Sequence, residues 1–135
     1  MPCRRLLIAV VILVSQASAL GQSARTPEYS SVQQGVYSTT QAARGEAVWN
    51  NHCAECHYPE EYSNGYLSAW NGENVFDLYA YLRITMPYLE PGTLENEQYV
   101  DVTAYLLSQN LLPAGDIELE VDRQALQGIL IEGPF

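Results

Sequence analysis

The run Cys53-Ala54-Glu55-Cys56-His57 is the part of the sequence best suited to chemistry. Two thiols at this spacing lie about one helical turn apart, so both can form thioethers with the two vinyl groups of one haem. The histidine directly after the second cysteine is then placed to bind the haem iron. The pattern therefore predicts one haem c, covalently bound through Cys53 and Cys56, with His57 as a metal ligand.

Two other uses of these cysteines stay open. An exported chain can close Cys53 and Cys56 as a thioredoxin-type disulfide, although that motif belongs in an alternating strand–helix context that the neighbouring sequence lacks. A zinc site would need further ligands, and the only other histidine of the chain is His52. We interpret His52 as a solvated or packing residue and retain the disulfide as the main alternative to haem attachment.

Met86 is the candidate for the second axial ligand. It is the only methionine besides Met1. Pro87 disfavours the α conformation at Met86, so a helix should end just before it and leave Met86 at the start of an extended strap. A lone methionine is ordinarily core filler, but a haem iron needs a sixth ligand. We therefore expect the Met86 thioether to bind the iron.

Helices must position these residues, because no strand pattern of comparable length appears. Ser38-Thr39-Thr40-Gln41 has the form of a capping box and predicts a helix that runs from there into the haem motif. Gly45 costs about 1 kcal/mol relative to alanine inside such a helix, which suggests close packing by another helix. Apolar residues at helical spacing predict two further helices, over about 73–85 and 95–109. The sequence therefore predicts an all-α domain.

The two ends of the chain have a different character. Arg4 and Arg5 precede an apolar run and a small-residue tail that ends at Ala19, which is typical of a secretory signal peptide. We therefore expect residues 1–19 to be a signal peptide and 20–37 a flexible lead-in. The domain itself is expected at 38–135, with an irregular tail after residue 116 that wraps the surface. An uncleaved N-terminal anchor is the alternative, and cleavage would leave no membrane span.

The acidic composition of the chain limits the classes of partner that it can bind. The 135 residues suit one domain, and the 16 acidic residues far exceed the 6 basic ones, all of which are arginine. Loss of the signal peptide would move the formal net charge from −10 to −12, because it removes two arginines and no carboxylate. Such an acidic chain is a poor candidate for binding nucleic acid or anionic membrane surfaces.

The sequence resembles single-haem, class I cytochrome c of the bacterial periplasmic type. The resemblance covers nearly all of the chain after the signal and is carried, in the order found in that family, by Ala42-Ala43-Arg44-Gly45, Cys53–His57, Leu67-Ser68-Ala69-Trp70, Thr85-Met86-Pro87 and Tyr99–Leu107. It implies N-terminal and C-terminal helices that cross around one covalently bound haem, with Gly45 close to Tyr105. It also implies His57 and Met86 as axial ligands.

The resemblance further implies an exported electron carrier rather than an enzyme. We expect it to serve a periplasmic dehydrogenase or a respiratory chain, through redox partners with a basic docking face. A haem subunit of a larger oxidoreductase, or a haem enzyme or gas sensor with an open sixth position, are the alternatives. Trp70 and Arg83 are candidate cofactor-binding residues near the propionates, as are the tyrosines Tyr79, Tyr81 and Tyr88.

One departure from the family concerns the histidine ligand. Many members have a proline well after the haem histidine, and its carbonyl accepts the imidazole N–H. Here the nearby prolines are Pro59, which is close to His57, and Pro87. A ligating histidine is expected to have such a partner. The sequence leaves the partner of His57 open.

Overall fold

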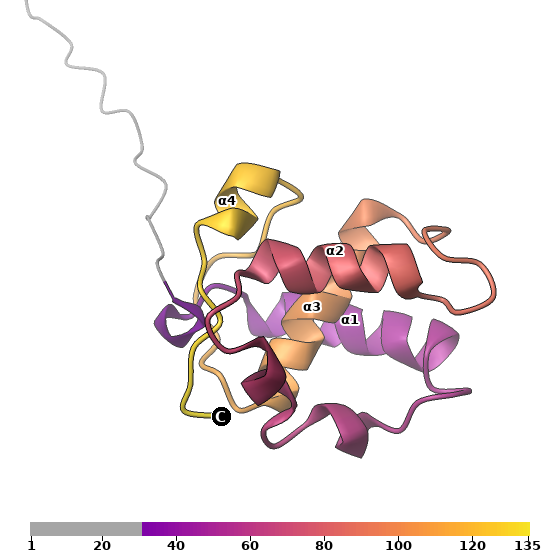
Figure 1. The fold of residues 1–135 in the computed structure, drawn as a ribbon, viewed down its shortest axis with the longest axis horizontal. Coiled ribbons are helices and arrows are strands. Elements are labelled where there is room, and N and C mark those ends of the chain that lie inside the picture. The colour runs from indigo at the N-terminus through magenta and orange to yellow at the C-terminus, as the bar shows by residue number, and fades with distance from the viewer. Residues whose placement is uncertain (1–30) are drawn as a thin grey trace, which may run out of the picture.

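The computed structural model describes residues 31–135 and shows an all-α domain (Figure 1). The predicted signal peptide and residues 20–30 of the lead-in lie outside the described residues. Within residues 31–135 there is no β-strand, only two isolated bridges that both involve Leu130. The α-helices are α1 (Thr39–His52), α2 (Val75–Thr85), α3 (Asn96–Gln109) and α4 (Arg123–Gln127), and the 3-10 helices are η1 (Val32–Gln34), η2 (Pro59–Tyr62) and η3 (Tyr66–Trp70).

The start of α1 confirms only half of the expected capping box. The Ser38 side chain accepts a hydrogen bond of 2.9 Å from the Gln41 backbone N–H, as an N-cap should. The Gln41 side chain turns away from Ser38 and is buried against the tail. Its amide donates to the Leu119 carbonyl at 2.9 Å and accepts from the Leu119 N–H at 2.8 Å. The Gln41 side chain therefore bonds to the backbone of Leu119 and not to the backbone N–H of Ser38, as a capping box would require.

Helices α1 and α3 cross (Figure 1). Gly45 lies at this crossing, as the sequence predicted. A Cβ atom built on Gly45 would overlap the backbone carbonyl of Asp101 and lie 2.9 Å from the Cβ of Tyr105. The missing side chain lets the two backbones touch, which compensates for the poor helix propensity of glycine. The helix that crosses α1 is α3, and the tail with α4 follows it.

The two later helices match their predicted bounds within two residues. α2 begins at Val75 because Asn74 and Asp77 form a reciprocal capping box, with bonds of 3.2 and 3.3 Å. α3 begins after Glu95, whose N–H donates to the Gln98 side chain at 3.0 Å. The predicted apolar faces are buried, and their residues are Val75, Leu78, Tyr79, Leu82, Tyr99, Val102, Tyr105 and Leu106.

Both ends of the described chain pack into the core, which corrects two expectations. Residues 31–37, placed by the sequence in the flexible lead-in, contain η1 and bury Val32, Val36 and Tyr37. The tail was expected to be irregular and superficial, but it contains α4 and buries four apolar side chains, those of Leu119, Leu126, Ile129 and Ile131. Hydrogen bonds of 2.9 Å join the Val32 N–H to the Leu130 carbonyl and the Val75 N–H to the Ile129 carbonyl, so the ends lie together beside the start of α2 (Figure 1).

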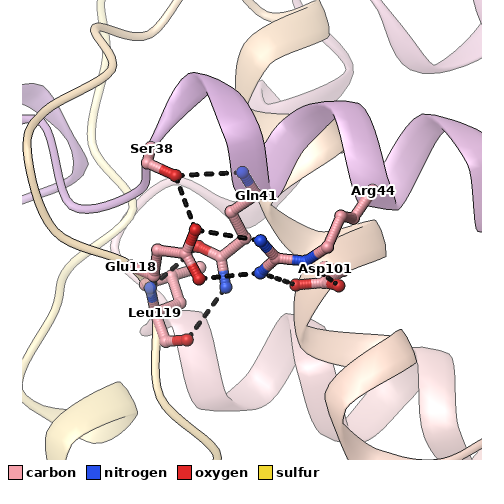
Figure 2. Close-up of polar contacts among 6 residues, drawn as sticks. All are labelled: Ser38, Gln41, Arg44, Asp101, Glu118 and Leu119. Atoms are coloured by element: carbon pink, nitrogen blue, oxygen red, sulfur yellow. Dashed lines mark hydrogen bonds and ion pairs between the residues drawn. The ribbon is translucent and has the colours of Figure 1, made fainter.

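Arg44 joins the crossing helices to the tail (Figure 2). Its guanidinium donates two hydrogen bonds of 2.9 and 3.0 Å to the Asp101 carboxylate on α3. It donates two more, of 3.0 and 2.7 Å, to Glu118 in the tail, which also accepts from the Ser38 hydroxyl at 2.8 Å. The planar guanidinium suits such paired contacts with carboxylates. These bonds hold the pKa of Glu118 below its ordinary value, with the hydrogen bond from Arg44 as the largest cause.

Replacing Arg44 with alanine should lower the free energy of unfolding by about 1 kcal/mol near neutral pH, since the guanidinium is 46% exposed and water screens the pairs. A carboxylate whose pKa is depressed in the folded state stabilises the fold above its ordinary pKa and loses that contribution as the pH falls through the folded pKa. The difference between wild type and Arg44→Ala should therefore shrink below pH 4.5, the ordinary value for Glu118. Denaturant titrations from pH 7 to pH 3 would measure it. Glu120→Gln, an exposed carboxylate of the same tail, is the control, and a difference that stays constant across this range would contradict the assignment.

Candidate functional site

A cavity of about 740 Å³, including its open mouth, lies between the end of α1, α2 and α3. Its lining includes three of the residues predicted to handle the haem, namely Cys53, His57 and Met86. The other lining residues are aromatic or aliphatic and are Trp49, Tyr62, Tyr66, Tyr81, Leu82, Pro87, Leu94, Tyr99 and Val102. The fold thus brings side chains that are up to 53 positions apart in the sequence to the wall of one largely apolar cavity.

The cysteine motif forms the turn that ends α1. The Cys53 N–H donates to the Trp49 carbonyl at 2.8 Å, and the Cys53 carbonyl accepts from the Cys56 and His57 N–H groups at 3.0 and 2.9 Å. Both thiols are free; Cys53 is half-buried and Cys56 is exposed. Burial raises the pKa of the Cys53 thiol. The turn places His57 in the cavity wall, whereas His52 is exposed, as expected.

The His57 ring is held by a residue that the sequence analysis did not identify. The Tyr62 hydroxyl lies 2.8 Å from His57 Nδ1, and the two rings meet edge to face with their centroids 5.3 Å apart. Trp49 contacts both rings, with centroids 5.0 Å from Tyr62 and 6.1 Å from His57. Burial raises the pKa of Tyr62, so the phenol keeps its proton at neutral pH. This contact occupies one of the two ring nitrogens of His57 and leaves Nε2 for another ligand.

Met86 begins an extended strap directly after α2, as Pro87 predicted. Its backbone has φ −127° and ψ 151°, and its N–H donates to the Leu82 carbonyl at 2.9 Å. The Met86 carbonyl accepts two hydrogen bonds, from the Tyr99 hydroxyl at 2.7 Å and from the Gly92 N–H at 3.2 Å. Three main-chain hydrogen bonds therefore fix this residue while its side chain lines the cavity.

Trp70 and Arg83 do not line the cavity in this structure. Trp70 is half-buried beside it and packs against Tyr81, with ring centroids 5.4 Å apart. Arg83 is exposed, and its Nε donates to the Asn96 side chain at 2.9 Å, which draws the guanidinium toward the start of α3. Of the three tyrosines considered with them, Tyr81 lines the cavity, Tyr79 is buried in the core and Tyr88 is 81% exposed.

The indole N–H of Trp49 favours a bound ligand that has a hydrogen-bond acceptor near the cavity. Its Nε1 is the buried side-chain nitrogen that has no hydrogen-bond partner within residues 31–135. Buried N–H groups are nearly always satisfied, by protein, water or a ligand. A haem has carboxylate groups that accept such bonds, and the Cys53 thiol, the imidazole and the thioether that line this cavity are groups that haem c uses. The residues present therefore fit a haem.

Comparisons with known proteins agree with this chemistry. Residues 40–106 match the family model described as "Cytochrome C oxidase, cbb3-type, subunit III". No curated protein and no solved structure matches the chain. The matched segment begins in α1, contains the cysteine motif and the Met86 strap, and ends in α3, so it spans the whole wall of the cavity. The chain therefore belongs to the single-haem class I cytochrome c family, and Cys53 and Cys56 are its attachment points for a covalent haem c.

Proposed function

We propose that this protein is an exported carrier of single electrons in which His57 and Met86 are the two axial ligands of the iron. The observation that carries this proposal is that both side chains line one cavity beside the attachment turn. The bound haem supplies one-electron chemistry through the Fe(III)/Fe(II) couple. A cytochrome c domain of this family is an electron carrier.

The chain's own residues would hold and insulate the redox centre. Leu82, Leu94 and Val102 give the cavity apolar walls, which exclude water and disfavour the more highly charged oxidised state. A methionine ligand acts in the same direction and raises the reduction potential. The Tyr99 hydroxyl donates to the Met86 carbonyl at 2.7 Å and so fixes the backbone from which the thioether would reach the iron. This arrangement suits a carrier with a relatively high potential.

The proposed partners are redox proteins with a basic face. The carboxylates of Glu55, Glu60 and Glu61 are exposed around the haem motif, and that of Glu90 is exposed in the strap. The chain has no lysine to offset them. Such a field steers a cationic partner toward the cavity and raises association rates about 10- to 1,000-fold at low salt. Within residues 31–135, no helix is long and apolar enough to cross a bilayer.

The test is the rate of electron transfer with the native donor as a function of ionic strength. The bimolecular rate constant should fall as salt rises, because the Debye length shrinks from about 10 Å at 0.1 M to about 3 Å at 1 M. The double variant Glu60→Gln, Glu61→Gln should show a lower rate at low salt and a weaker salt dependence. Glu120→Gln removes an exposed carboxylate near the opposite end of α1 and is the matched control. A rate that stays flat or rises with salt would remove the steering proposal.

A haem subunit of a larger oxidoreductase is the second candidate. The matching family is described by the name of an oxidase subunit. Tyr88 and Leu89 are 81% and 89% exposed and directly follow the cavity-lining Pro87, which suits a lasting apolar contact. Size-exclusion chromatography of a native extract with a haem stain distinguishes the two. Elution near the mass of the single chain supports the free carrier, and elution with a larger complex supports the subunit.

A further inference from the structure

We propose that Tyr62 is the positioning residue of the axial histidine: its hydroxyl accepts the Nδ1 proton of His57 and so directs Nε2 to the iron. This inference rests on His57 being the iron ligand, and it fills the role that the family usually gives to a proline carbonyl. The contact is a hydrogen bond of 2.8 Å in the structure.

Binding of the iron through Nε2 would leave one arrangement of the imidazole. A neutral imidazole has one N–H and one free lone pair. With the Nδ1–H donated to the Tyr62 oxygen, the lone pair is on Nε2, which is the atom that a metal would take. The edge-to-face packing of the two rings, with an interplanar angle of 83°, limits rotation about the Cβ–Cγ bond of His57. With an iron at Nε2, the hydrogen bond to Tyr62 would hold the proton on Nδ1, and the ring packing would hold the orientation of the imidazole.

Tyr62 is itself held by a buried amide at the end of α3. The Asn110 Nδ2 donates to the Tyr62 carbonyl at 2.9 Å and to the Leu106 carbonyl at 2.9 Å. The Asn110 Oδ1 accepts from the Gly65 and Leu67 N–H groups at 3.2 and 3.3 Å. Asn110 is 2% exposed, so water competes little for these bonds.

The Tyr62 ring is also enclosed on its sides. Its centroid lies 5.0 Å from that of Trp49 and 4.8 Å from that of Tyr66. The backbone of Tyr62 is held by Asn110 and its ring by Trp49 and Tyr66. The structure therefore fixes the position of the phenol oxygen beside His57. The phenol is neutral, so it strengthens the basicity of His57 less than a carboxylate would. This moderate acceptor is compatible with the high potential that a methionine ligand favours.

Tyr62→Phe removes the oxygen and keeps the ring, so the Trp49 and Tyr66 contacts remain. Without the acceptor, His57 becomes a weaker donor to the iron and the oxidised state loses stabilisation. The reduction potential of the holoprotein should rise, by up to about a tenfold change in the equilibrium, which is 59 mV for one electron. In the ¹H NMR spectrum, the Nδ1 proton of His57 should exchange slowly with solvent in wild type and rapidly in the variant. Tyr37→Phe removes a phenol hydroxyl that donates to the Leu112 carbonyl outside the cavity, and it is the matched control.

Two readouts separate this inference from the proposed function. A wild-type spectrum without low-spin His/Met character would overturn the proposed ligation. Normal ligation, together with a potential and a proton exchange rate in Tyr62→Phe that equal those of Tyr37→Phe, would overturn the role of Tyr62 alone. If Tyr62→Phe does not accumulate with haem, ¹⁵N-histidine labelling of the wild type decides. An Overhauser contact between the Nδ1 proton and the Tyr62 ring supports the inference, and an Nδ1 proton that exchanges rapidly and shows no such contact refutes it.

Discussion

Replacing Met86 with alanine should leave the haem covalently attached but lower its reduction potential by on the order of 100 mV or more, because axial ligands set haem potentials over about 0.8 V. Attachment depends on Cys53 and Cys56, which the substitution does not touch. Loss of the thioether removes the ligand that favours the reduced state. The open position should then bind carbon monoxide in the reduced protein, which wild type should not do.

The structure explains why alanine should open the site rather than collapse it. The three hydrogen bonds that fix residue 86 are all made by its main chain, to Leu82, Gly92 and the Tyr99 hydroxyl. Alanine keeps them, so the strap should stay in place around the missing side chain. Potentiometric titration and carbon monoxide difference spectra measure the two effects. Leu89→Ala, which alters an exposed residue of the same strap, is the control. Unchanged potential and ligand binding in Met86→Ala would reassign Met86 to packing.

Gly45→Ala should destabilise the folded protein by about 3 kcal/mol, at the upper end for an overpacked core position. The new methyl group would meet the Asp101 carbonyl, which is backbone and cannot rotate away. The two helices would have to separate, and separation would also loosen the contact between Trp49 and Tyr105, whose ring centroids are 5.7 Å apart. Because Trp49 lines the cavity, the haem environment should change together with stability.

The sign of this effect is diagnostic. Helix propensity alone would make alanine more stable than glycine by about 1 kcal/mol. A loss of stability therefore shows that packing against α3 outweighs propensity, and a gain would show that the helices do not touch at Gly45. Ala43→Gly, at an exposed position of α1, is the matched control and should cost about 1 kcal/mol through propensity alone. Denaturant titration of the holoproteins gives the free energies of unfolding of wild type, Gly45→Ala and Ala43→Gly.

Local signals in the sequence predicted the parts of this protein that depend on neighbours along the chain. The cysteine motif identified haem attachment because its chemistry requires a short fixed spacing. Pro87 predicted the end of α2 and the extended backbone of Met86, since a proline restricts the residue before it. Gly45 indicated the helix crossing, because glycine is unfavourable in a helix unless something else needs the space.

Contacts between distant segments were decided only by the tertiary structure. The tail joined the core because Gln41 pairs with the backbone of Leu119, an interaction across 78 positions that leaves no periodic pattern. Arg83 was drawn to Asn96 rather than to the cavity, because an exposed arginine takes whichever acceptor the fold places within reach.

The hydrogen-bond partner of His57 also depends on a contact between distant segments. Ten tyrosines are alike in the sequence. Tyr62 became the one beside His57 because Asn110, 48 positions later, fixes its backbone. The sequence by itself determined which two cysteines attach the haem and where the helices end, since both follow from covalent spacing and local backbone preference. The tertiary structure alone decided which side chains contact His57 and Met86, because a hydrogen bond between remote residues depends on how the helices pack.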